Sequence, residues 1–212
     1  VIRGSFQSSL RTNRSMPEAT SAHDVRQIVH GDHSNPFSVL GLHRVASDGA
    51  ETDILRAFVP WATELYAILS EGEEPVAMQR IHPSGFFVAA LPPRERGTYR
   101  LRATTDHGDS VEFPDPYAFG PTLGELDLHL LGEGRDLQLY RKLGAHPVAV
   151  EGISGVRFAV WAPNASRVSV VGDFNHWDGR RHPMRNLGPT GLWEIFIPDL
   201  QPGEVYKYEI RS

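Results

Sequence analysis

One aromatic side chain lies in an unusually polar corner of the sequence. Trp177 falls within residues 172–179, a stretch rich in Gly, Asp and Asn, where a core residue is not expected. An indole in such a turn can keep one face open, and an open indole can bind the apolar face of a sugar ring. The composition therefore makes Trp177 a candidate for an exposed binding residue; the alternative is a tryptophan that packs the corner. Asn175 either contributes to the same site or supports the turn.

Other reactive residue types are absent or poorly placed. The chain has no cysteine, which removes disulfides, thiolate zinc sites and thiol nucleophiles. Glu73 and Glu74 lie in a polar turn, so we expect solvated charges there and not an acid/base pair. His30 and His33 flank a Gly-Asp turn without the spacing of a two-ligand helix motif. We therefore expect no metal and no other cofactor.

Composition and charge exclude two classes of partner. The 212 residues carry 21 Lys and Arg against 26 Asp and Glu, a net charge of −5. A chain this acidic has no basic field for nucleic acid or anionic lipid, and the Arg180-Arg181 pair is too small to supply one. No apolar run approaches the about 18 residues of a membrane span. The 20 Gly and 16 Pro favour short elements and β structure.

The strands expected on either side of Trp177 belong to a repeat. Two blocks of sequence recur at offsets of 103 and 106 residues, and a tyrosine recurs one residue further on. The matching positions are apolar strand positions and turn prolines, which preserve a pleat and its corners. We therefore predict an all-β fold of two tandem immunoglobulin-like β-sandwich modules. The aligned residues are 55–62 with 158–165, 85–92 with 191–198, and Tyr99 with Tyr206.

The repeat also sets the expected domain boundaries. Residues 16–121 form the first module, residues 122–147 a short helical connector, and residues 148–212 the second module. The first module continues for 22 residues after Tyr99, whereas six residues follow Tyr206. The second module is therefore expected to be truncated and to lack its last strand.

Capping residues predict two helices outside the strands. Thr20 or Ser21 can cap a short leading helix, which Gly31 would end. Residues 122–125 resemble a capping box in which Thr122 precedes the connector helix.

Residues 1–15 differ from the rest, because their only charges are three arginines and they contain no acid. We expect a disordered tail, left by cloning or belonging to upstream sequence; a transit peptide is the alternative.

The remaining tryptophans show no comparable signal. Trp161 and Trp193 occupy repeat-matched strand positions, with Phe58 and Phe87 as their counterparts. Both are therefore expected to pack in the core. Trp61 has no aromatic counterpart, and the sequence assigns it no role.

Four motifs resemble the N-terminal part of bacterial 1,4-α-glucan (glycogen) branching enzymes. The resemblance extends over about residues 24–212, and the longest motif, which includes Trp177, is the most specific. The motifs are NPFSVLGLH at 35–43, DPYAFGP at 115–121, VWAPNA at 160–165 and VSVVGDFNHWDGRRHPM at 168–184.

The resemblance implies an N-terminal module, then a family 48 carbohydrate-binding module, then an α-amylase-type barrel. The barrel, with its Asp nucleophile and Glu acid/base, is absent from this chain, so no residue here inherits a catalytic role. The family 48 pattern Phe-Asn-x-Trp places the aromatic platform at Trp177. In related glycogen-binding modules a lysine at the position of Lys207 meets sugar hydroxyls; its alternative is a solvated strand residue. The expected substrate-binding residues are thus Trp177, Lys207 and Asn175.

Together these inferences predict a non-catalytic N-terminal fragment that positions or binds α-glucan for the absent barrel of its own protein. The glucan would be glycogen, amylose or a maltooligosaccharide, the parent would form α-1,6 branches, and the location would be cytoplasmic. Residues 69–75, the counterpart of the Trp177 corner, hold no aromatic residue and three carboxylates, so the first module is expected to be a spacer or docking module. The alternatives are a purely structural scaffold and a regulatory subunit that brings a partner enzyme to glycogen.

Overall fold

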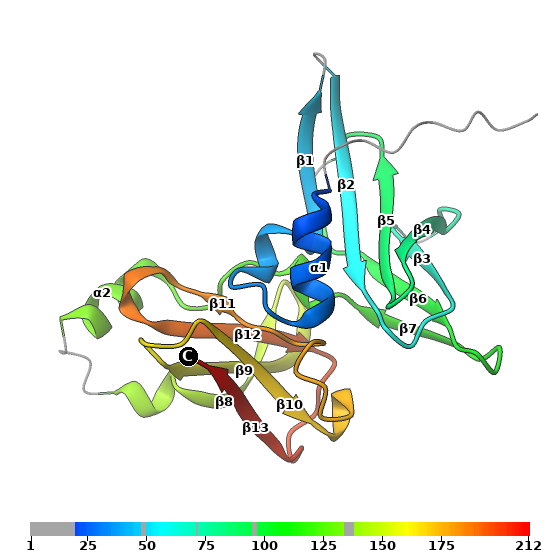
Figure 1. Ribbon diagram of the computed structural model, residues 1–212. Helices are drawn as coiled ribbons and strands as arrows, with labels where there is room; N and C mark the ends of the chain where they lie inside the picture. Colours follow the sequence, from blue (N-terminus) through cyan, green and yellow to red (C-terminus); the bar gives the residue numbers. More distant parts are fainter. Residues whose placement is uncertain (1–19, 48–49, 71, 95–96, 134–137) are drawn as a thin grey trace, which may run out of the picture.

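A computed structural model describes residues 20–47, 50–70, 72–94, 97–133 and 138–212. The prediction for the tail at 1–15 lies outside the described residues. Figure 1 shows two β-rich modules side by side, joined through the segment that carries α2.

The first module is a single antiparallel sheet of seven strands that folds over on itself. Its strand order is β1-β2-β5-β4-β3-β6-β7. Leu55 and Ala57 of β2 share one buried core with Leu101 and Ala103 of β6, so the two ends of the sheet face each other as a sandwich. The elements are α1 (Ala22–His30), η1 (Pro36–Ser38), β1 (Gly41–Ser47), β2 (Ala50–Phe58), β3 (Glu64–Ile68), β4 (Val76–His82), β5 (Phe86–Leu91), β6 (Arg100–Thr104), β7 (Ser110–Pro114) and η2 (Pro116–Ala118).

The second module has the same design in two sheets. A four-stranded sheet in the order β11-β12-β9-β8 packs against the pair β10-β13. Phe158 of β9, Val170 of β10 and Ile195 of β12 lie in the core between them. The elements are α2 (Glu125–Gly132), η3 (Leu139–Arg141), β8 (Gly144–Val150), β9 (Ile153–Trp161), β10 (Arg167–Gly172), η4 (Asp173–Asn175), β11 (Arg185–Asn186), η5 (Gly188–Thr190), β12 (Leu192–Pro198) and β13 (Tyr206–Arg211).

The predicted all-β fold and its repeat are confirmed, and the repeat is longer than the aligned strands. The order β1-β2-β5-β4 corresponds to β8-β9-β12-β11, and the pair β3-β6 corresponds to β10-β13. The helix α2 begins 103 residues after α1, and η3 begins 103 residues after η1. The residues expected to form a connector therefore correspond to the leading helices of the second repeat. Within the described residues, β7 has no counterpart in the second module.

Equivalent turns in the two modules use the same hydrogen bonds. The Nε2 atom of His43 lies 2.9 Å from the carbonyl oxygen of Leu40, and Nε2 of His146 lies 2.8 Å from that of Leu143. The backbone amides of Val59 and Ala162 each donate over 2.8 Å to a glycine carbonyl that opens the returning strand. These matched contacts fix the same corner geometry in both repeats.

The leading helix α1 follows its predicted boundaries. The Ser21 hydroxyl accepts from the backbone N–H of His23, and Gly31 ends the helix in the left-handed region with φ 69°. The predicted capping box at Thr122 is wrong, because α2 begins after Gly124, whose N–H donates to Asp127 over 3.1 Å.

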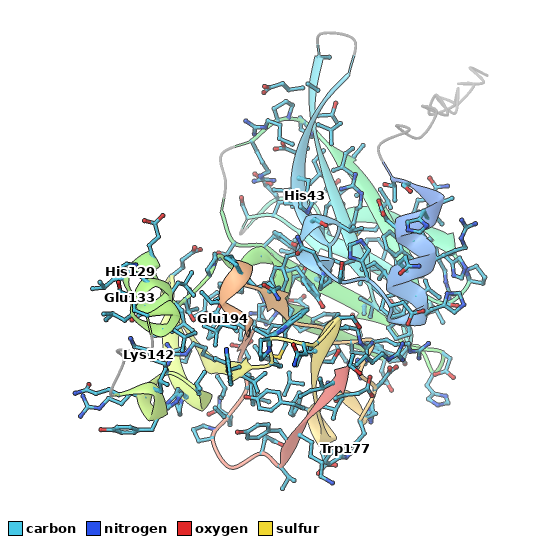
Figure 2. The ribbon with its side chains drawn as sticks, turned by 60° about the vertical axis from the view of Figure 1, so that its left-hand side comes forward. His43, His129, Glu133, Lys142, Trp177 and Glu194 are labelled. Carbon is cyan, nitrogen blue, oxygen red and sulfur yellow. The ribbon has the colours of Figure 1, made fainter. Side chains whose placement is uncertain are left out.

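Thr122 instead contacts Glu194, a fully buried carboxylate on β12 that is labelled in Figure 2. The backbone N–H and the hydroxyl of Thr122 donate to Glu194 over 3.1 and 2.6 Å, and the N–H of Leu123 donates over 2.9 Å. Hydrogen bonds to Glu194, together with the packing of Leu123 against Ala159 and Leu192, therefore hold the segment that enters α2 against the second sheet.

Two buried arginines of the second module contact the first module. Arg167 of β10 donates to the carbonyl of Gly31 and, within its own module, to the carboxylate of Glu209. Arg185 donates to the carbonyl of Phe119 over 2.7 Å. Every residue of β10 is buried, and Arg167 at its start reaches Gly31 of the first module.

Candidate functional site

Trp177 lies in the corner that connects β10 to β11. Its indole Nε1 donates to the Asp173 carboxylate over 2.7 Å, and its backbone N–H donates to the Gly172 carbonyl over 2.9 Å. The side chain is 42% exposed although its ring nitrogen and its backbone N–H are both hydrogen-bonded. The corner therefore presents an indole that is fixed in place and open to solvent, at the end of the second module labelled in Figure 2.

The backbone of this corner is strained. His176 and Trp177 both adopt left-handed backbone conformations, with φ 56° and φ 58°. Such a conformation costs an L-residue about 1–2 kcal/mol, so tertiary contacts must hold it.

Asn175 supplies the contacts that hold the corner. Its side chain is fully buried. The amide nitrogen donates to the Val170 carbonyl and to Nδ1 of His182, each over 2.9 Å, and its oxygen accepts from the Gly172 N–H over 3.0 Å. An amide engaged in this way supports the turn, which the sequence left as the alternative, and is not available to a sugar.

Lys207 lies beside Trp177 although thirty residues separate them in the chain. It is on β13, directly opposite Val171 of β10, and is exposed. Its ammonium nitrogen is 5.9 Å from the centre of the Trp177 ring. In the part of the chain that the structure describes, no carboxylate pairs with it. We call the Trp177 indole together with the Lys207 ammonium the Trp177 platform.

The carboxylates around the platform are already engaged. Asp178 forms a bidentate pair with Arg180, with oxygen–nitrogen distances of 2.9 and 2.7 Å, and these hydrogen bonds hold the pKa of Asp178 below its usual value. Asp173 accepts the indole N–H of Trp177. The arrangement can therefore bind a ring and donate to hydroxyls, but it offers no acid/base pair for bond cleavage.

The prediction of core packing holds for Trp193 and is wrong for Trp161. Trp193 is buried, whereas Trp161 is 58% exposed and donates from Nε1 to the Thr190 carbonyl over 2.9 Å. Its counterpart Phe58 is covered by α1, in one cluster with Val29. At the position of Val29, the helix α2 has Gly132, which carries no side chain to cover the indole. Comparing the two helices position by position in the sequence would have revealed this difference.

Two family models match the chain. Residues 21–117 match "alpha-1,4-glucan branching enzyme GlgB, N-terminal domain", and residues 142–212 match "Carbohydrate-binding module 48 (Isoamylase N-terminal domain)". The Trp177 platform lies in the second match. No helix among the described residues is long and apolar enough to cross a membrane.

Curated proteins called 1,4-alpha-glucan branching enzyme GlgB are similar over most of the chain. The relative from Rubrobacter xylanophilus is 49% identical over 188 residues, which are 89% of this chain and 25% of that protein. The relative from Cereibacter sphaeroides is 52% identical over 88% of this chain and 25% of that protein. The relative from Paramagnetospirillum magneticum is 50% identical over 92% of this chain and 26% of that protein. The chain thus spans about a quarter of the length of these relatives.

Proposed function

Because the chain belongs to the N-terminal region of the bacterial 1,4-α-glucan (glycogen) branching enzyme family, we propose that its second module binds α-glucan without catalysis, through the Trp177 platform. The observation that carries this proposal is the fixed, solvent-open indole with the Lys207 ammonium 5.9 Å from its ring centre, an ammonium that pairs with no carboxylate among the described residues. The apolar face of a glucose unit loses water against the indole, and Lys207 donates to hydroxyls at the rim of the ring.

The size of the platform argues for weak binding. A glucose face that covers about 60 Å² of indole gains roughly 1.5 kcal/mol at about 25 cal/mol per Å². The lysine adds little, because desolvation of its ammonium offsets part of the new hydrogen bond. Ordering of a flexible glucan opposes both gains. Repeated glucose units on one polymer would raise the apparent affinity by multivalency.

The ligand would be glycogen, amylose or a maltooligosaccharide, held for the catalytic barrel of the whole enzyme. That barrel would cleave an α-1,4 linkage and rejoin the released chain as an α-1,6 branch. Its Asp nucleophile and Glu acid/base would lie outside the residues described above, and the protein would work in the cytoplasm.

A purely structural role is the second candidate, and the contacts between the modules favour it. Glu194 fastens the segment at 122–123, and Arg167 and Arg185 join the two modules. A scaffold of this kind could position a barrel without any affinity for sugar.

Affinity electrophoresis in gels with and without glycogen separates the two candidates. Wild type should be retarded by glycogen, and Trp177→Ala should raise the apparent Kd about tenfold, the equivalent of roughly 1.4 kcal/mol. The expected retardation should change little between low and moderate salt, because the ligand is neutral.

Trp161→Ala is the matched control, since it removes an exposed indole from the same module at a different place. It should leave the retardation unchanged. If folded Trp177→Ala is retarded as strongly as wild type, the platform assignment is wrong. If folded wild type is not retarded at all, the structural role is the better description.

A further inference from the structure

A cavity of about 310 Å³ lies between the two modules, apart from the Trp177 indole. The first module contributes Trp61 and Phe113 to its wall, and the second module contributes Phe174, Arg181 and His182. Its volume lies near the lower end of the range for small-molecule sites, about 300–1,000 Å³.

Arg181 is the most unusual group in this wall. It is partly buried, and burial lowers the pKa of its guanidinium. Among the described residues, no carboxylate lies within 4.0 Å of the guanidinium and no acceptor takes a hydrogen bond from it. Its neighbour Arg180 is fully paired with Asp178, which leaves Asp178 committed elsewhere. Arg181 therefore places at the cavity a positive charge that the nearby Asp178 attracts but that no carboxylate among the described residues pairs with directly.

His182 offers a second donor beside it. Its Nδ1 accepts from the Asn175 amide over 2.9 Å, so the ring proton is on Nε2. Burial lowers the pKa of His182 to about 3, so the ring is neutral at physiological pH. Within the described ranges, Nε2 has no acceptor. The unused proton faces away from Asn175, on the side of the ring opposite to that bond.

An aromatic wall completes the cavity. The Trp61 and Phe113 rings lie 5.8 Å apart, centre to centre, and the carbon of the Arg181 guanidinium is 5.9 Å from the Trp61 ring centre. A ligand that reached Arg181 would therefore lie against apolar ring surface.

The acids in the wall do not compensate Arg181. Asp199 lies 3.4 Å from Arg100, with which it forms an ion pair. Asp115 is buried and accepts from the Tyr99 hydroxyl over 2.6 Å and from the Tyr117 N–H over 3.0 Å. Both carboxylates thus have other partners, and the donors of Arg181 and His182 match an acceptor-rich anion.

We propose that this cavity binds the phosphate group of a sugar phosphate, with Arg181 and His182 donating to the phosphate oxygens and the sugar ring lying against Trp61. An Arg fork matches phosphate geometry and is strengthened by partial burial. A sugar supplies the apolar face that the aromatic wall can cover. The phosphate could belong to a free monosaccharide phosphate or to a phosphorylated glucan, since both present the same group.

Isothermal titration of the chain with glucose 1-phosphate at low ionic strength tests this site. Wild type should bind glucose 1-phosphate more tightly than inorganic phosphate, and binding should weaken as salt is added. Arg181→Gln should weaken binding about tenfold or more, since a hydrogen bond between charged groups is lost. The affinity of Arg181→Lys should lie between those of wild type and Arg181→Gln, because lysine keeps the positive charge but loses the bidentate guanidinium geometry. A maltooligosaccharide phosphate as competitor distinguishes the two sources: competition indicates a glucan-bound phosphate, and no competition indicates a free sugar phosphate.

Arg102→Gln is the control for charge, because Arg102 is an exposed arginine of the first module paired with Glu112. It should bind as wild type does, and so should Trp177→Ala. Thermal melting must show that each variant is folded. Failure of wild type to bind glucose 1-phosphate, or equal binding by folded Arg181→Gln, would overturn the proposal. Equal affinity for inorganic phosphate would overturn the placement of a sugar on Trp61. Each of these failures leaves the glucan proposal standing, because that proposal rests on retardation by unphosphorylated glycogen.

Discussion

The corner between β3 and β4 in the first module and the corner between β10 and β11 in the second occupy equivalent places in the repeat. The first is a short turn whose Glu73 pairs with Arg94 at 3.8 Å. The second is a longer loop in which the buried Asn175 holds Trp177 open to solvent. The strands that enter the two corners, β3 and β10, have similar lengths, so the open indole at the second corner comes from the loop, beside Lys207 on β13.

A second contrast lies inside the sheets. Glu194 on β12 occupies the place that Val88 occupies on β5, and both are buried. Tyr99 before β6 donates to the buried Asp115 over 2.6 Å, whereas its counterpart Tyr206 packs against Phe158 and Tyr208. One scaffold thus tolerates a carboxylate or a valine at the same position, provided that the neighbours differ accordingly.

The largest effect is expected from Glu194→Ala. The change leaves the N–H groups of Thr122 and Leu123 without their acceptor and Arg185 without the carboxylate 3.8 Å away. Loss of one partner of a buried charged network costs about 3–5 kcal/mol. Urea denaturation of Glu194→Ala should therefore show an unfolding free energy lower than that of wild type by an amount in this range. Val88→Ala at the equivalent position removes only methyl groups and should cost less; an equal or smaller loss for Glu194→Ala would remove the contrast.

The two modules should respond to acid in opposite directions. Burial lowers the pKa of His182 to about 3, so the stability that its neutral ring provides is present above the unfolded value near 6.5 and is lost as the pH falls. Burial raises the pKa of Asp115 to about 6, so its proton favours the folded state below pH 6, and that contribution is lost as the pH rises through 6.

Between pH 6.5 and pH 5, protonation of His182 in the unfolded state should lower the unfolding free energy of wild type by about 2 kcal/mol. The variant His182→Gln should not show this loss. As the pH falls from 6 to 4, the protonated Asp115 should raise the unfolding free energy of wild type. The variant Asp115→Asn should not show this gain. Unfolding curves measured at each pH provide the test. Parallel pH profiles for His182→Gln and wild type would contradict the assignment of a buried neutral imidazole.

Amide exchange compares the two sheet edges more finely. β6 lies between β3 and β7, whereas β13 pairs with β10 alone among the described strands. Amides on the open side of β13 should exchange about tenfold faster than those of β6, a difference of roughly 1.4 kcal/mol in local opening. Equal protection would mean that the outer edge of β13 is covered.

The smallest effect is expected from Lys207→Ala. The ammonium is exposed, so its loss should raise the apparent Kd for glycogen only about threefold, or roughly 0.6 kcal/mol. Lys142→Ala is a control in the same module, on the α2 side and away from the platform in Figure 2. A larger effect for Lys207→Ala than for Trp177→Ala would mean that hydrogen bonds and not the indole dominate binding.

The parts of the fold that depend on local pattern could be predicted from the sequence. Ser21 and Gly31 bound α1 because capping requires only a side-chain oxygen and a left-handed residue. The strands that flank Trp177 were predictable because their repeat preserves apolar positions. Trp177 itself was identified as exposed by the composition of its corner.

What depends on long-range partners could not be predicted. Thr122 has the sequence of a helix cap, but the buried carboxylate of Glu194, 72 residues away, takes its hydroxyl. Trp161 matches a core position, but the helix over it has Gly132 where α1 has a valine. Asn175 was named as a sugar ligand or a turn support, and only its three hydrogen-bond partners favour the second.

Arg167 couples the stability of α1 to that of the second module. One guanidinium nitrogen donates to Gly31 at the end of α1 and another to Glu209 on β13, while Arg211 pairs with Asp32 just beyond α1. Fraying of α1 would leave a buried guanidinium short of an acceptor, which opposes separate melting of the two repeats. We therefore expect the two repeats to unfold as a single cooperative unit in calorimetry, although each repeat has a core of its own.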